Sequence, residues 1–461
     1  MFLAIFSILL LTGNIYFFIK KKYLYLFIPC MLFLPEYYGV EFSALLPVLT
    51  VTRMMYIFFY IYALINRKRN ISLKNFSIKN LPREWLFLLG YFVLRLIANL
   101  YYAPVNGSAI KTIFEIIFEQ ILLLIAIYIL EPTNEEIFNT VKATVYGASV
   151  LFIVGSFETL TFIRPFDNLY TVNRTMINEH FIRFNFLRAT TTLGMPVFYG
   201  NFCLLMFTLI LYLYETTKYK RYIIIATLDM LAIVHSGCRS SIIFLLPIVF
   251  IYFVFILRDK TRRLQFLKHA TACILALVIF VGAISACNEY FRYFYTSSAK
   301  SVLNEFGFEF DLEADSPEYA TSGVHATGGH TRKMQISGIE YTMSTSPIFG
   351  LGSGAEDRSE VHYRHNNGRW YPDKTIDIGY VEVIIIEGII GGISYILLIL
   401  FILAIIKASD VSKIYEKRVL YLTVFTYFMC MLTTANMYNF LYFFIIIYIS
   451  TYFNNPNAKS S

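Results

Sequence analysis

Residues 378–406 read IGYVEVIIIEGIIGGISYILLILFILAII, a long apolar stretch that carries only two charged side chains, Glu382 and Glu387. About 20 apolar residues are enough for an α-helix to cross the hydrocarbon core of a bilayer, so this stretch predicts a transmembrane helix. It follows directly on a polar segment of about ninety residues, 288–377. A membrane protein with one large polar loop usually keeps its chemistry where the loop meets the bilayer, so we expect the functional site near this boundary.

The rest of the chain has the same apolar character. Of its 461 residues, 57% are apolar and 15% are charged, against roughly 25% charged residues in soluble proteins. Further apolar runs predict spans near 1–19, 23–35, 43–65, 85–103, 112–130, 140–163, 193–214, 222–235, 240–257, 270–287, 419–434 and 438–453. The predicted fold is an all-α polytopic membrane protein with 11–13 transmembrane helices. It has an N-terminal bundle of about ten helices over 1–287, one large polar loop over 288–377, and C-terminal helices over 378–461.

The orientation of these spans follows from the positions of lysine and arginine, because basic loops stay on the cytoplasmic side. Basic clusters recur at alternate connections, namely 20–22, 66–83, 218–221, 258–268 and 407–418. The connection 131–138 is acidic where a basic one is expected. The pattern predicts that the loops 164–192 and 288–377 lie outside, and the N-terminus with them.

Several functional classes are disfavoured by composition. The net charge of +8 is explained by the basic anchors, so it predicts no nucleic-acid partner. The six cysteines show no Cys-x-x-Cys spacing and no Asp-x-Asp motif occurs, so we expect neither a metal nor another cofactor. No internal repeat is visible, whereas many transporters are built from two related halves.

Two charged groups inside predicted neighbouring spans suggest an ion pair. Arg95 and Glu119 each lie about eight residues from the short connection between their spans, roughly 12 Å deep at 1.5 Å per residue. We predict that they pair and lock this hairpin, with a direct catalytic role as the alternative. We expect Glu387 to be a structural partner rather than a base. Gly388 and Gly392 predict the close approach of another helix.

Arginines in the predicted outer loops run against the usual distribution of basic residues. Arg183 and Arg188 lie in the middle loop, Arg239 in a short turn, and Arg332 in the large loop. A guanidinium can grip a phosphate with two parallel hydrogen bonds and without a metal. We therefore predict that these four arginines bind a diphosphate. The alternative is salt bridging to the large loop, which holds 13 acidic and 8 basic residues.

Four short motifs, in order along residues 180–400, resemble those of O-antigen polymerases and ligases. They are Arg188-Ala-Thr-Thr-Thr-Leu-Gly-Met-Pro196, Ser236-Gly-Cys-Arg239-Ser-Ser, Pro347-Ile-Phe-Gly-Leu-Gly-Ser-Gly354, and Asp377-Ile-Gly-Tyr380 followed by Glu387-Gly-Ile-Ile-Gly-Gly392. The second motif departs from the family at Cys238, where a serine is usual. The resemblance implies a polysaccharide polymerase in the bacterial inner membrane.

That resemblance implies a reaction and its partners. A growing glycan moves from undecaprenyl diphosphate onto the sugar of an incoming lipid-linked unit on the periplasmic side, amid membrane lipid, and a chain-length regulator is a further candidate partner. Arg188 and Arg239 would bind the diphosphate, supported by Arg183 and Arg332. Asp377 and His365 are the candidate catalytic bases.

Two other functions remain open from the sequence. Ligases of this superfamily carry His-Asn just before the helix, where this chain has Asp377, and His365-Asn366 lies twelve residues earlier. A ligase would move finished glycan to another lipid acceptor. A flippase or other transporter for lipid-linked oligosaccharides is the third alternative, which the lack of internal symmetry disfavours.

Overall fold

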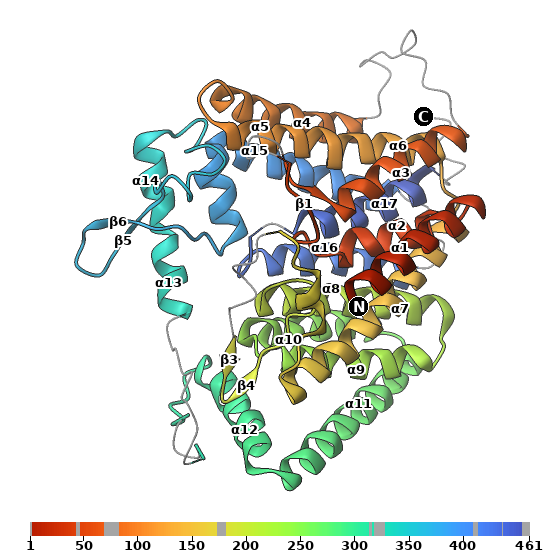
Figure 1. Cartoon of the computed structure of the whole chain (residues 1–461). Coiled ribbons are helices and arrows are strands. Elements are labelled where there is room, and N and C mark those ends of the chain that lie inside the picture. The colour runs from red at the N-terminus through yellow and green to blue at the C-terminus, as the bar shows by residue number, and fades with distance from the viewer. Residues whose placement is uncertain are drawn as a thin grey trace.

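A computed structural model describes residues 2–42, 47–68, 83–172, 181–312, 316–317, 328–408, 414–435 and 437–453. These residues are mostly α-helical (Figure 1). The helices are α1 (Phe2–Ile19), α2 (Leu24–Phe33), α3 (Val51–Ile65), α4 (Arg83–Tyr102), α5 (Gly107–Glu115), the π-helical η3 (Ile116–Ile121), α6 (Leu122–Leu130), α7 (Asn134–Thr161), the 3₁₀-helical η4 (Pro165–Leu169), α8 (Pro196–Thr217), α9 (Arg221–His235), α10 (Arg239–Ile256), α11 (Lys260–Cys287), α12 (Glu289–Asn304), α13 (Gly328–Gln335), α14 (Ser337–Thr345), α15 (Gly379–Ala408), α16 (Ile414–Cys430) and α17 (Tyr438–Phe453).

Sheet structure among the described residues is limited to three short antiparallel hairpins, all of them in connections between helices. They are β1 (Gly39–Val40) with β2 (Leu49–Thr50), β3 (Ile182–Arg183) with β4 (Phe186–Leu187), and β5 (His362–Arg364) with β6 (Trp370–Pro372).

Each predicted span overlaps one helix or one continuous helical segment, although the span near 43–65 begins before its helix, in a stretch that holds β2 and residues outside the described ones. Among the described residues, eight helices are long and apolar enough to cross a membrane. Leu24–Phe33, Val51–Ile65 and Tyr438–Thr451 are shorter apolar helices. Of the predicted all-α membrane protein, two parts are confirmed among the described residues: the predominance of helix and the presence of helices long and apolar enough to cross a membrane. The larger number of 11–13 spans would also require the shorter helices to cross.

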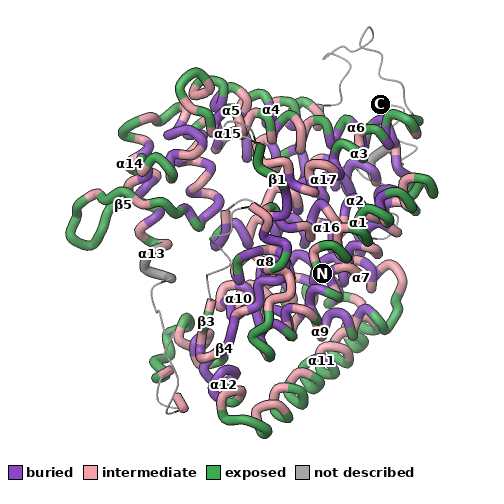
Figure 2. Tube along the Cα trace, in the orientation of Figure 1, coloured by how far each residue is buried: buried purple, intermediate pink, exposed green. Residues whose placement is uncertain are grey.

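The centre of the bundle is α8, which packs against α9 and α16. In the most apolar 18-residue stretch of α8, 78% of the residues are buried. In the corresponding stretches of α11 and α1 the buried share is 6% and 0%. A helix that is apolar on all sides is stable where neighbouring helices or lipid cover it. Figure 2 shows the same division, with buried positions along α8 and exposed ones along α11 at the edge of the molecule.

The acidic connection 131–138 lies beside basic residues from other parts of the chain. Lys68 Nζ donates to Glu136 Oε2 at 3.4 Å and to the backbone oxygen of Glu131 at 3.2 Å. The turn Lys20–Lys22 lines a cavity together with Glu135 and Glu136. The connection therefore reaches the same end of the bundle as two of the basic clusters, which offset its negative charge.

The polar segment 288–377 attaches to the bundle at two places. Its first helix, α12, packs Tyr293, Phe294 and Tyr295 against Phe184 and Phe186 of the β3–β4 hairpin. Its last part, comprising α14 and the β5–β6 hairpin, packs instead against the start of α15 through a separate apolar cluster. In Figure 1 this last part lies beside the start of α15, and the β5–β6 hairpin projects outward.

Candidate functional site: an arginine cluster and a broken helix

Arg183 and Arg188 flank the β3–β4 hairpin and donate to neighbouring carbonyls. Arg183 Nη1 donates to the Gly237 oxygen at 2.7 Å, and Arg188 Nε donates to the Ser236 oxygen at 3.0 Å. Gly237 has a φ of +58°, and a Cβ added there would lie 3.0 Å from Arg188 Cγ. The turn between α9 and α10 thus accepts both arginine side chains because residue 237 has no side chain of its own.

Arg188 is held by one nitrogen only. Its Nε is engaged, and no described residue accepts a hydrogen bond from Nη1 or Nη2. The paired ends of the guanidinium fork remain available, which is the arrangement that grips a phosphate with two bonds.

Glu158 holds the loop that carries Arg188 through hydrogen bonds to the loop backbone. The sequence predicted no role for Glu158. Glu158 Oε2 accepts hydrogen bonds from the backbone nitrogens of Thr190 and Thr191 at 3.0 and 2.9 Å. The Ala189 nitrogen donates to the His235 oxygen at 3.0 Å. Glu158 is fully buried three residues before the end of α7. Its only sequence signal was an acidic residue in an apolar span, which names no partner.

Arg239 and Arg332 approach from other segments. Arg239 is the first residue of α10, and its Nη1 lies 2.7 Å from Glu305 Oε1. Arg332 in α13 donates from Nη2 to the Thr433 oxygen at 3.3 Å. Arg239 acts on both Arg183 and Arg188, and Arg332 acts on Arg188. Burial lowers the pKa of Arg188, and Arg239 and Arg332 lower it further against the opposing effect of Cys238.

The positive charges of Arg188 and Arg239 also affect the pKa of Arg183. Burial, followed by Arg188 and Arg239, lowers it to about 10. The group is still cationic at neutral pH. Glu305 pairs with Arg239, while Arg183, Arg188 and Arg332 form no ion pair with any described carboxylate. Buried positive charge is costly where it exceeds the nearby negative charge, and among the described carboxylates only Glu305 pairs with one of these four arginines, so this cluster favours an anionic ligand.

The structure separates the two candidate bases, Asp377 and His365. Asp377 is joined to Gln335 by two hydrogen bonds of 3.0 Å, one to Oδ2 and one from its backbone nitrogen. Gln335 lies three residues after Arg332 in α13, about 4.5 Å along the axis. Asp377 is exposed two residues before α15 and is bound to the helix that carries Arg332.

His365 lies apart from that cluster. It is exposed in the turn of the β5–β6 hairpin, where the Gly368 nitrogen donates to its backbone oxygen at 2.9 Å. Its ring meets Tyr371 edge-on with centroids 4.7 Å apart. Figure 1 shows this hairpin projecting from the molecule. His365 lies close in sequence to the start of α15, and this short separation did not indicate that the two are apart in space. The reason is that a hairpin places its tip away from both of its ends.

A second feature is the interruption of α15 at Gly388, whose φ of +63° and ψ of −153° are not helical. Backbone groups of α15 on both sides of this interruption lack their helical partners, and the glycine turn 347–354 supplies hydrogen-bond partners for them. The Leu351 and Gly352 nitrogens donate to the Ile385 and Ile386 oxygens at 2.7 and 3.0 Å. From the other side of the break, the Ile389 and Ile390 nitrogens donate to the Pro347 and Ile348 oxygens at 2.9 and 3.2 Å. The large loop therefore inserts into an apolar helix.

Only glycine allows this contact. A Cβ on Gly350 would lie 2.5 Å from the Gly388 nitrogen, and a Cβ on Gly388 would lie 2.5 Å from the Gly350 nitrogen. We predicted that Gly388 allows another helix to approach closely. The close approach occurs, but the prediction was wrong about the approaching segment, which is a loop. Gly392 meets nothing within 4 Å, so the prediction does not hold there.

The predicted pair Arg95–Glu119 does not form. Arg95 Nε instead lies 3.0 Å from Glu387 Oε1, and both side chains are buried. Glu119 Oε1 lies 2.6 Å from Arg53 Nε, and Glu115 Oε1 lies 2.7 Å from Arg53 Nη2. The physical reason is that α4 packs along α15, so Arg95 faces a helix almost 300 residues further along the chain. From the hairpin partner, Gln120 and not Glu119 reaches Arg95, at 3.3 Å.

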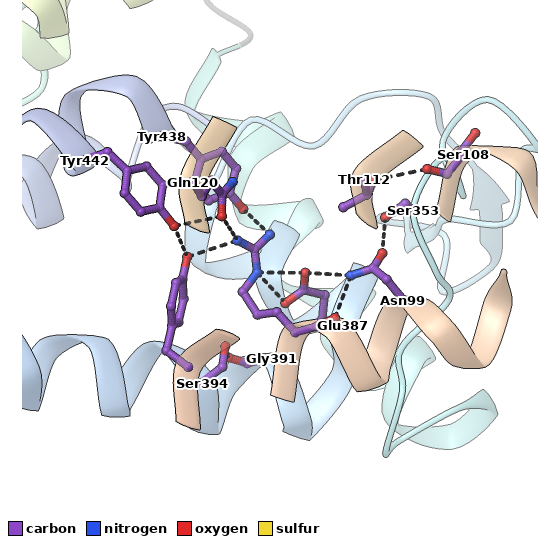
Figure 3. Close-up of polar contacts among 12 residues, drawn as sticks. Asn99, Ser108, Thr112, Gln120, Ser353, Glu387, Gly391, Ser394, Tyr438 and Tyr442 are labelled. Atoms are coloured by element: carbon purple, nitrogen blue, oxygen red, sulfur yellow. Dashed lines mark hydrogen bonds and ion pairs between the residues drawn. The ribbon is translucent and has the colours of Figure 1, made fainter. Parts of the chain in front are cut away.

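Glu387 is also linked to the glycine turn (Figure 3). Asn99 Nδ2 donates to Glu387 Oε1 at 3.2 Å, and Asn99 Oδ1 accepts from Ser353 Oγ at 2.7 Å. Tyr91 and Tyr438 complete the shell of Arg95 at 3.0 and 3.1 Å. The ion pair is thus fully hydrogen-bonded inside the bundle, and one of its connections leads to the large loop.

Comparison with known proteins adds no assignment, since no family model, no curated protein and no solved structure matches this chain.

Proposed function

We propose that the protein is a polysaccharide polymerase that joins glycan repeat units carried on undecaprenyl diphosphate. The observation that best supports this is the convergence of arginines from three distant segments, with the Nη donors of Arg188 unengaged by any described residue. A diphosphate carries the concentrated negative charge that such a cluster favours. O-antigen or capsular polysaccharide are equally suitable products.

In this proposal the protein spans the bacterial inner membrane 11–13 times, with the large loop 288–377 in the periplasm. The agreement between the helices and the apolar runs of the sequence supports the insertion. The alternation of basic clusters supports the orientation.

The transfer proceeds by displacement at the anomeric carbon of the donor glycan. The acceptor hydroxyl oxygen forms a bond to that carbon, the bond from the carbon to the diphosphate oxygen breaks, and its electron pair leaves with undecaprenyl diphosphate. Arg188 and Arg239 stabilise the charge on the departing group, supported by Arg183 and Arg332. The hydroxyl proton passes to Asp377, which is exposed and held beside the helix of Arg332. His365 has no part in this step because the hairpin turn carries it elsewhere.

Deletion of the gene, followed by gel analysis of surface glycan, tests the proposal. Loss of a polymerase leaves single repeat units on the acceptor. Loss of a ligase leaves no glycan on the acceptor, which would favour that alternative. Unchanged ladders would refute both, and accumulation of repeat units on the cytoplasmic side would favour a flippase.

A further inference from the structure

A cavity of about 600 Å³ lies at the end of the bundle where α1, α2 and α7 meet. It is far in sequence from the arginine cluster and takes no part in the proposed transfer. Four lysines line it, namely Lys20, Lys21, Lys22 and Lys142, against two carboxylates, Glu135 and Glu136. The cavity therefore carries more positive than negative charge.

One of the two carboxylates is already engaged. Glu136 Oε2 accepts from the Thr133 nitrogen at 2.8 Å and lies 3.4 Å from Lys68 Nζ. None of the four lining lysines forms an ion pair with a carboxylate in the described part of the chain. Glu135 alone remains to offset them.

Two further groups add to the positive potential. The cavity includes the first turns of α7, whose N-terminus carries the positive end of the helix dipole. The Arg221 guanidinium lies 5.8 Å from the centre of the Tyr146 ring, which forms part of the wall. Positive charge therefore lies on more than one side of the cavity.

The turn that carries the three consecutive lysines has a defined shape. The Lys22 nitrogen donates to the Phe17 oxygen at 3.0 Å and the Lys21 nitrogen to the Phe18 oxygen at 3.1 Å, which is the usual closure of a helix end. Glycine normally occupies the left-handed position of this closure, but Lys21 occupies it here with a φ of +55°. A lysine is therefore held at a strained position next to the cavity, with its side chain exposed.

The surroundings identify the class of ligand. Ile15 and Ile19, in the last turns of α1, are 53% and 71% exposed and directly precede the lysines. The apolar surface of α1 ends at three consecutive lysines. A phospholipid fits this arrangement, because its acyl chains can lie beside the helix while its phosphate contacts the lysines. Such basic pockets between helices on the cytoplasmic side bind anionic lipid headgroups.

We propose that this cavity binds the phosphate-bearing headgroup of an anionic membrane phospholipid, whose acyl chains lie along α1. The proposal rests on insertion of the helices in a membrane and is independent of the glycan chemistry.

The test uses the purified full-length protein in detergent, titrated with phosphatidylglycerol or with phosphatidylcholine of the same chain length, and bound lipid is counted by native mass spectrometry. We expect retention of phosphatidylglycerol over phosphatidylcholine. Lys142→Gln should weaken phosphatidylglycerol binding about fivefold, and Glu135→Gln should strengthen it by a similar factor. Lys268→Gln, which removes an exposed basic charge outside the cavity, should leave it unchanged.

Two further results decide the remaining interpretations. Equal binding by wild type and Lys142→Gln, with equal thermal unfolding of the two proteins in detergent, would overturn the site. Displacement of the lipid by millimolar glycerol phosphate would overturn the lipid assignment in favour of a soluble phosphate compound. Because neither variant belongs to the arginine cluster, glycan extension can fail without affecting this outcome, and the two proposals are tested separately.

Discussion

Arg188 illustrates at the residue scale how position gives a common side chain a specific capability. Its Nε is fixed by the Ser236 oxygen at 3.0 Å, while Arg239 and Arg332 supply positive charge nearby. The guanidinium is therefore oriented before any ligand arrives, which limits the entropy lost on binding. A lysine at this position would keep the charge but lose both the Nε bond and the fork.

We accordingly expect Arg188→Lys and Arg239→Lys each to abolish chain extension while the protein still inserts in the membrane. Loss of a charge-assisted hydrogen bond costs about 1.5–3 kcal/mol, which corresponds to a roughly tenfold to hundredfold slower transfer for each bond lost, and losing the two bonds of the fork together multiplies these factors. The measurement is the ladder of surface glycan in cells that express each variant at wild-type level. Arg369→Lys, in the exposed β5–β6 hairpin, is the control, and wild-type ladders from both test variants would exclude the diphosphate role.

Gly237 offers a second prediction at this scale. Gly237→Ala places a Cβ 3.0 Å from Arg188 Cγ at a φ of +58°. Gly368→Ala imposes a similar strain at a φ of +77° but meets nothing within 4 Å. Both variants should lose about 1–2 kcal/mol of stability from backbone strain, measured by thermal unfolding. Only Gly237→Ala should also lose glycan extension, and equal activity of the two would show that the position of Arg188 is unimportant.

The element that most distinguishes this chain is α15. A backbone that leaves the helical path inside a membrane must find partners for its polar groups, because lipid offers none. Here the glycine turn 347–354 provides four hydrogen bonds across the break at Gly388. The motifs around Gly350 and Gly388 therefore act as one unit.

Substitutions at two glycines of α15 separate this role from helix propensity. Gly388→Ala should destabilise the protein by at least about 1–3 kcal/mol, because its φ and ψ are nearly exclusive to glycine and the new Cβ would lie 2.5 Å from the Gly350 nitrogen. Gly392→Ala meets nothing within 4 Å and should be neutral or stabilising by up to about 1 kcal/mol. Thermal unfolding in detergent measures both, and an equal effect would contradict the docking of the turn.

The ion pair between α4 and α15 can be tested by double-mutant cycles. Arg95→Met or Glu387→Gln alone leaves an uncompensated buried charge and should cost about 3–5 kcal/mol. The two changes together should cost much less than their sum. The cycle of Arg95→Met with Glu119→Gln should be additive within about 0.5 kcal/mol, since Glu119 pairs with Arg53. Strong coupling in that second cycle would instead support an ion pair between Arg95 and Glu119.

At the scale of the whole molecule, the topology itself gives a prediction. Cys287 at the end of α11 is an exposed free cysteine, and the proposed orientation puts it outside. A membrane-impermeant maleimide should therefore label intact spheroplasts of the wild type and not of Cys287→Ser. Lys260→Cys introduced into the Cys287→Ser protein, at the other end of α11, should be labelled only after permeabilisation. The reverse pattern would invert the proposed topology.

The extent of correct prediction differs between features for a physical reason. Every predicted span overlaps a helix, but Arg95 was given the wrong partner. Spans are set by local hydropathy, whereas the choice among Glu115, Glu119 and Glu387 depends on which helices pack together. The four arginines were named from the sequence because outer basic residues are unusual, while Glu158 and Gln120 carried no comparable signal.

The sequence by itself determined that this chain is a bundle of apolar helices with one large polar segment. It could do so because a helix satisfies its own backbone hydrogen bonds, so a run of apolar residues is sufficient information. The tertiary structure alone decided that the large segment inserts a glycine turn into α15 and that Arg95 meets Glu387, 292 residues away. Both contacts join distant segments, and no local pattern specifies which of several charged or glycine-rich stretches will meet.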